Sequence, residues 1–171
     1  MYKYEITKYN PNLRDEKRMY LKKDWTSISD IGKSFENELL TTESYKKSED
    51  SYIKAIIMSM EYLHIPFLSV NNILRSFSCE RFVEMREDCE LYSQDIIEMY
   101  NQVKDGDKLY IGQVDSFCRL LLREDIGSDI FYPRRMKIFI GYDYLMGVHT
   151  SKSMDALIPF IEQLNLFVEK Y

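Results

Sequence analysis

Apolar residues recur along this sequence at two different periods, and the segments with each period follow one another irregularly. A period of two over residues 2–7 is typical of a strand with one buried face. Helical spacing extends from an expected N-cap at Thr41 to His64, and Pro66 separates this helix from an apolar, strand-like segment at residues 67–70. Because strands are few and do not alternate regularly with helices, the sequence predicts an α+β protein rather than a doubly wound sheet.

Three further segments have clear predictions. Residues 79–103 show the most regular helical spacing and predict one long helix. Residues 136–149 predict two adjacent strands that form a hairpin with its tip at residues 141–143. Helical spacing over residues 154–168 predicts a terminal helix, which Pro159 either kinks or opens in its first turn. The resulting expectation is a small antiparallel sheet packed with four or five helices.

The composition favours one folded domain over residues 1–171. Hydrophobic residues make up 45% of the chain and charged residues 30%, which is typical of globular rather than disordered proteins. The three cysteines Cys79, Cys89 and Cys118 have no metal-like spacing, which favours buried thiols over a reactive or ligating role. The amino terminus lacks a signal-like apolar region and the apolar runs are far shorter than the roughly 20 residues of a membrane span, so we expect a cytoplasmic protein.

A search for an active site finds no recognisable motif. The sequence has no glycine-rich phosphate loop, no nucleophile elbow and no zinc motif. Its two histidines, His64 and His149, have no partner visible in the sequence, so ordinary roles at a helix end and a strand end are favoured over catalysis. Two carboxylate pairs could bind a divalent ion or act together in acid/base chemistry, although exposed acids more often solvate a surface: Glu87 with Asp88, and Glu124 with Asp125. We therefore expect no catalytic residue, no metal and no cofactor.

The outer side of the helix predicted at residues 79–103 is acidic. Six carboxylates lie away from the apolar stripe, and only two arginines counter them; the acids are Glu80, Glu84, Glu87, Asp88, Asp95 and Glu98. Such a one-sided set is either a solvated helix face or a surface that meets a basic protein. The net charge of −5 disfavours nucleic acid as a direct partner, because phosphate binding needs clustered Lys and Arg, and it permits a basic protein.

The hairpin tip offers a second candidate surface. The segment GYDY places Tyr142, Asp143 and Tyr144 together, either as a turn flanked by strand tyrosines or as two aromatic anchors and one charge for a partner. The candidate partner-binding residues of the whole chain are therefore Glu84, Glu87, Asp88, Asp95, Glu98, Tyr142, Asp143 and Tyr144.

Residues 2–35 predict a strand, a charged turn, a second short strand and a helix that begins at residues 26–29. This stretch, above all KYEITKYNP and DWTSISDIGKSF, resembles the opening of small bacterial immunity proteins of contact-dependent growth inhibition and related polymorphic-toxin systems. Residues 48–74 and 106–147 share the resemblance, which thus covers well over half of the chain. None of these stretches contains a catalytic signature.

The resemblance implies a protein that binds a cognate toxin domain stoichiometrically and occludes its active site or substrate groove. It also implies a toxin of nuclease type, such as an EndoU-like RNase, whose RNA-binding surface would be basic. Two other classes stay open on the sequence: a small cytoplasmic enzyme without a recognisable motif, and a regulatory adaptor. A neighbouring reading frame for a secreted protein with a toxin tail would favour an immunity protein over both.

Overall fold

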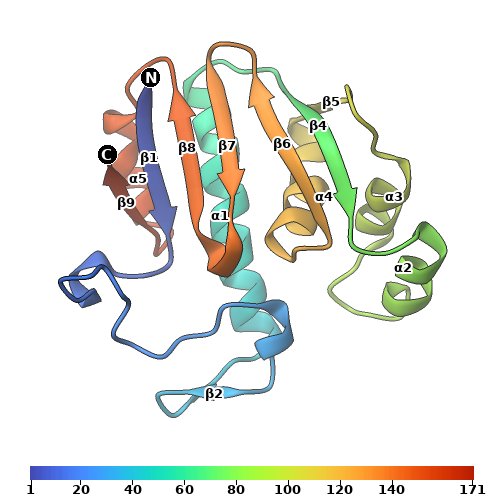
Figure 1. Ribbon diagram of the computed structural model, residues 1–171, viewed down its shortest axis with the longest axis horizontal. Coiled ribbons are helices and arrows are strands. Elements are labelled where there is room, and N and C mark those ends of the chain that lie inside the picture. Colours follow the sequence, from blue (N-terminus) through green and yellow to red (C-terminus); the bar gives the residue numbers. More distant parts are fainter.

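The computed structural model describes residues 1–171 and contains a seven-stranded sheet with helices on one of its faces (Figure 1). The strand order is β5-β4-β6-β7-β8-β1-β9, and each neighbouring pair is antiparallel. The strands of this sheet are β1 (Tyr2–Thr7), β4 (Phe67–Arg75), β5 (Lys108–Tyr110), β6 (Ile126–Tyr132), β7 (Met136–Ile140), β8 (Met146–Thr150) and β9 (Phe167–Lys170). The predicted α+β class with an antiparallel sheet is confirmed.

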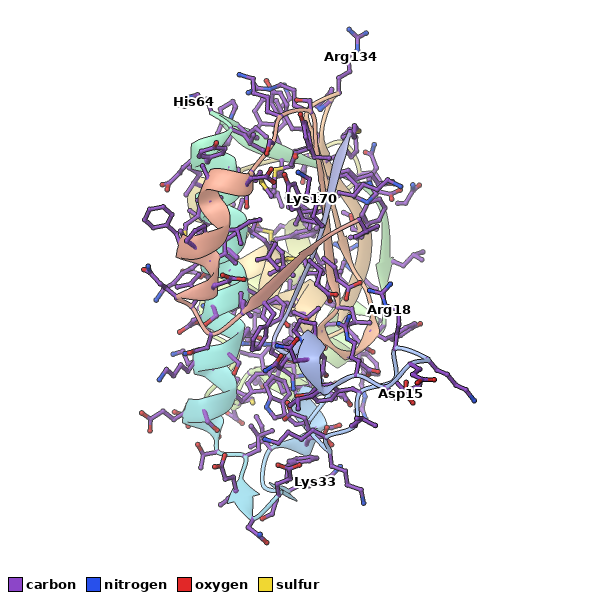
Figure 2. All side chains as sticks on the ribbon, turned by 90° about the vertical axis from the view of Figure 1, so that its left-hand side faces the viewer. Asp15, Arg18, Lys33, His64, Arg134 and Lys170 are labelled. Carbon is purple, nitrogen blue, oxygen red and sulfur yellow. The ribbon has the colours of Figure 1, made fainter.

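Five α-helices form the second layer, which Figure 2 shows beside the sheet. They are α1 (Thr42–Tyr62), α2 (Cys79–Arg86), α3 (Gln94–Gln102), α4 (Ile111–Leu122) and α5 (Ile158–Glu162). Helix α3 packs on α4, and α2 packs on α3. Helices α2 and α3 therefore extend the helical layer beyond β4. None of the helices has the length and apolar composition that a bilayer crossing requires.

One hydrophobic core joins the two layers. Alternate residues of the strands point into it, for example Tyr4 and Ile6 of β1 and Met146 and Val148 of β8. The residues between them lie on the opposite face of the sheet, which no helix covers and which is called the open face below (Figure 2). This alternation follows directly from the period of two in an antiparallel strand.

Several local predictions are confirmed. Strand β1 has the predicted bounds, and α1 begins at Thr42, directly after Thr41, whose hydroxyl accepts a hydrogen bond of 3.1 Å from the Ser44 N–H. His64 follows α1 with a left-handed backbone (φ 52°), the conformation that commonly ends a helix. The predicted hairpin is formed by β7 and β8, in which Ile138 pairs with Val148.

The prediction of one long helix over residues 79–103 is wrong. The chain leaves α2 after Arg86 and starts α3 at Gln94, and residues 87–93 form a bend between them. The ring of Phe82 stacks on that of Tyr100, with centroids 3.6 Å apart and planes inclined by only 6°. In a continuous helix these residues would be roughly 27 Å apart, so this contact requires the bend. The apolar stripe is present, but it folds back on itself.

The terminal helix predicted over residues 154–168 is also wrong in its extent. Helix α5 covers only Ile158–Glu162, and Pro159 lies in its first turn, the second of the two roles expected for it. The chain then enters β9, in which Val168 pairs with Ile6 of β1. No strand was predicted at the position of β6. The register of its pairing with β4 shifts between Asn71 and Leu74, and this shift disrupts the alternation of buried and exposed side chains along the strands.

Residues 8–41 lack most of the structure predicted for them. In place of the second strand there is a single β-bridge between Tyr20 and Arg14. In place of the helix, residues 28–30 form one 3-10 turn that Ser27 caps. Gly32 adopts a positive φ of 91° and its N–H donates to the Leu40 carbonyl, so the chain reverses before a helix can extend. A two-stranded ribbon follows, made of β2 (Ser34–Phe35) and β3 (Glu38–Leu39).

Candidate partner-binding surface

The acids predicted to line one helix face are all exposed, although the helix that would align them is broken. Seven carboxylates on α2, α3 and the bend at residues 87–93 are exposed, and together they define the acidic surface: Glu80, Glu84, Glu87, Asp88, Glu90, Asp95 and Glu98. Arg81 pairs with Glu84 at 3.4 Å, and Arg86 points instead toward Asp125. Glu90 was not among the acids expected from the sequence. All seven acids are therefore exposed within one short stretch of chain, residues 80–98.

Buried contacts fix the bend that carries part of the acidic surface. The Tyr92 hydroxyl donates to the Asp125 carboxylate at 2.7 Å, and the guanidinium of Arg123 lies 4.6 Å above the Tyr92 ring. Burial raises the pKa of the Asp125 carboxyl, and the hydrogen bond from Tyr92 and the charge of Arg86 offset that effect only in part. Asp125 is thus an interior residue, and it does not form an exposed pair with Glu124.

The aromatic turn, residues 141–145, presents its tyrosines on opposite sides. The Tyr142 side chain is 78% exposed, Asp143 is exposed, and Tyr144 is only 2% exposed. Tyr144 lies in the core, where its ring is 4.9 Å from that of Trp25 and 5.5 Å from that of Tyr52. Of the three residues predicted at the tip, Tyr142 and Asp143 are therefore available to a partner, whereas Tyr144 anchors the turn from within.

The backbone of the aromatic turn is strained. Asp143 and Tyr144 both have positive φ, at 59° and 61°, a region that residues with a bulky side chain rarely occupy. Each such residue costs about 1–3 kcal/mol, so the surrounding contacts must hold it in place. The Tyr52 hydroxyl donates to the Tyr144 carbonyl at 2.7 Å, and the Gly141 N–H donates to the Leu145 carbonyl at 2.8 Å. The exposed position of Tyr142 is thus imposed by the fold.

The structure brings the turn and the start of the acidic surface to the same end of the sheet, which is its lower end in Figure 1. A cavity of about 490 Å³ is lined by Tyr142 from the turn and by Leu74, Arg75 and Ser76 at the end of β4, shortly before α2 begins at Cys79. Leu74 is 73% exposed because the register shift in β4 turns it outward. It is an apolar surface residue that the sequence analysis had not singled out.

A second cavity, of about 780 Å³, lies on the other side of the aromatic turn. Asp143 and Leu145 line it together with Tyr9, Tyr20 and Phe35 of the N-terminal segment. Its cationic residues include Arg14, which pairs with Glu5 and Glu169, and Lys22, which pairs with Glu36. The turn therefore borders two cavities, one lined in part by the end of β4 and one lined mostly by residues of the N-terminal segment.

The two histidines lie apart. His64 ends α1 on the helical side at the upper end of the molecule in Figure 2, and its side chain makes no hydrogen bond. His149 lies on the open face, with its ring 4.7 Å from Phe139. Partial burial and the charges of Lys3 and Lys137 lower the pKa of His149. No group of three or more His, Cys, Asp or Glu side chains is placed to hold a metal ion.

Comparison with models of known protein families finds no match, and comparisons with curated proteins and with solved structures find none either.

Proposed function

We propose that this chain is an immunity protein, which binds a basic toxin domain stoichiometrically in the cytoplasm and blocks it without chemistry of its own. The observation that carries the proposal is the acidic surface, whose seven carboxylates are exposed and of which only Glu84 has a cationic partner. The resemblance of residues 2–35, 48–74 and 106–147 to immunity proteins points to the same role.

The acidic surface suits fast association with a basic partner. Uncompensated like charges on one face create a potential that steers an oppositely charged protein and raises the association rate. The same charges are repelled by RNA, so the chain and the substrate of a toxin RNase would compete for one basic groove. Occlusion of that groove is sufficient to protect the cell.

The aromatic turn suits slow dissociation. An exposed tyrosine supplies a large, rigid contact area at low entropic cost, and residues of this type often dominate binding energy. Tyr142 projects next to the apolar side chain of Leu74, and the cavity between them can accept a side chain of the partner. The cavity lies at the same end of the sheet as the start of α2, the first element that carries acids of the acidic surface.

The proposal is tested by co-expression with the toxin domain encoded in the adjacent upstream reading frame. Cells that produce the toxin domain alone should stop growing, and cells that also produce this chain should grow. Purified toxin domain and chain should elute together at a 1:1 ratio. Growth arrest in spite of folded, abundant chain would refute the proposal.

Association should depend strongly on salt. Raising the salt concentration from about 0.05 M to about 0.5 M shortens the Debye length from more than about 10 Å to about 4 Å, and the association rate constant should fall at least about tenfold. Stopped-flow mixing measures this rate constant, and the dissociation rate constant should change far less. An association rate that does not respond to salt would contradict steering by the acidic surface.

Neither histidine should be needed for protection. His64→Gln and His149→Gln should both leave growth rescue intact, because the two side chains lie apart and neither has the base and nucleophile partners that catalysis requires. Growth rescue is measured beside circular dichroism and toxin binding for each variant. A variant that folds and binds normally but no longer protects would show that the chain acts by more than occlusion.

A further inference from the structure

The carboxylate of Glu49, a residue of α1, is buried in the core of the protein. Its side chain is fully buried, and both of its oxygens accept charged hydrogen bonds. Arg123 donates to Oε1 and Oε2 at 2.7 Å each, and Arg119 donates to Oε2 at 2.6 Å. The Tyr45 hydroxyl donates to Oε1 at 3.2 Å. Glu49 is therefore the centre of a buried network that joins α1 to α4.

One branch of this network reaches the aromatic turn. Because the single Tyr45 proton is donated to Glu49, the Tyr144 hydroxyl donates to the Tyr45 oxygen, and the two hydroxyls are in hydrogen-bond contact. Burial raises the pKa of both phenols, so both retain their protons at neutral pH. Glu49 thus holds Tyr144, whose left-handed backbone projects Tyr142 outward.

The other branch reaches the acidic surface. Arg123, which Glu49 fixes with two hydrogen bonds, donates to the Leu91 carbonyl in the bend at 2.6 Å. Its guanidinium also packs on Tyr92, the last buried residue before α3. The bend carries Glu87, Asp88 and Glu90. One buried carboxylate is therefore linked by hydrogen bonds to both candidate surfaces.

We infer that Glu49 is a positioning residue which, through Tyr45 and Arg123, holds the aromatic turn and the acidic bend in one fixed arrangement for a single basic partner. This inference rests on the proposed function for the identity of the partner. A surface that is ordered before binding loses less conformational entropy in the complex, so it binds more tightly than a mobile surface with the same contacts.

Tyr45→Phe tests the branch to the turn, because it removes one hydroxyl and leaves Glu49 paired with both arginines. In the free variant, amide hydrogen exchange at Gly141 and Leu145, whose N–H groups close the turn, should become faster, and exchange at Cys89 and Tyr92 in the bend should not change. Dissociation from the upstream-encoded toxin domain should become about tenfold faster, which corresponds to roughly 1.4 kcal/mol.

Arg123→Lys tests the branch to the bend. Lysine keeps the positive charge beside Glu49 but cannot reproduce the fork that reaches Glu49 and the Leu91 carbonyl together. Exchange at Cys89 and Tyr92 should become faster in this variant, and the complex should again dissociate faster. The matched control is Tyr4→Phe, which removes a buried hydroxyl that bonds to the Met154 N–H and Asp155, away from both surfaces. It should change neither exchange in these segments nor dissociation.

A double variant separates positioning from a general loss of stability. If Tyr45 acts by holding the turn that projects Tyr142, then Tyr45→Phe should speed dissociation far less in a chain that already carries Tyr142→Ala. An equal effect in both backgrounds, or unchanged exchange at Gly141 and Leu145, would overturn the inference. If the parent chain does not bind the toxin domain, the proposed function fails, and the exchange measurements on the free chain still decide whether Tyr45 and Arg123 hold these segments.

Discussion

Changing Glu84, Glu87, Asp88 and Asp95 together to lysine is expected to weaken toxin binding at least about a hundredfold and to leave the fold intact. Each change replaces an attractive charge by a repulsive one, and like charges opposed across an interface cost several kcal/mol, whereas a hundredfold in affinity needs only about 2.7 kcal/mol. The dissociation constant of the purified complex, measured by calorimetry at low and high salt, checks this result.

The fold should tolerate these four changes because the side chains are exposed and outside the core. Their only ion pair, between Glu84 and Arg81 at 3.4 Å, joins two highly exposed groups and contributes little. Asp95 lies in the first turn of α3, where its loss costs about 0.3–1 kcal/mol. The thermal midpoint should therefore change by only a few degrees.

A matched control reverses four other exposed carboxylates that make no ion pair or side-chain hydrogen bond, namely Glu16, Glu38, Glu61 and Glu162. This control variant has the same net charge as the first but keeps the acidic surface, so it should retain most of the affinity. Equal binding by the parent and the first variant would show that the acidic surface is only a solvated face. The interface would then have to be sought around Tyr142.

Glu49→Gln is expected to lower the free energy of unfolding by about 3–5 kcal/mol, because it leaves the Arg119 and Arg123 guanidinium groups side by side without the buried carboxylate that balances them. Glutamine has a similar shape, so the lower free energy of unfolding would come from the lost charge rather than from a cavity. For a chain of this length the thermal midpoint should fall on the order of 10 °C. Urea unfolding followed by tryptophan fluorescence measures the change.

The control for this prediction is Asp50→Asn. Asp50 also pairs with Arg119, at 2.6 Å, but its side chain is 36% exposed, so water can replace the interaction. Asp50→Asn should therefore lower the free energy of unfolding by less than about 1 kcal/mol. Should the two substitutions cost the same, Glu49 would be an ordinary ion-pair partner. It would then have no special role in the stability of the core.

The elements that could be predicted from the sequence are those whose structure depends on local pattern. The period of two gives β1, the cap at Thr41 and the apolar spacing after it give α1, and the hairpin of β7 and β8 follows from two short apolar runs around a turn. One signal of the buried network was also present. Glu49 interrupts the apolar stripe of α1 between Tyr45 and Tyr52, a position where an unpaired acid would be costly.

Other features depended on contacts between residues far apart in the chain. Helical spacing shows which side of a segment is apolar but not what that side packs against, so the stacking of Phe82 on Tyr100, which requires the bend, was invisible. Residues 167–170 form β9 because they pair with β1 at the other end of the chain. Likewise, GYDY contains two similar tyrosines, and only the packed core decides that Tyr144 is buried and Tyr142 exposed. The sequence by itself determined the fold class and the acids available for a surface, and the tertiary structure decided how they are arranged, because long-range packing outweighs local preference.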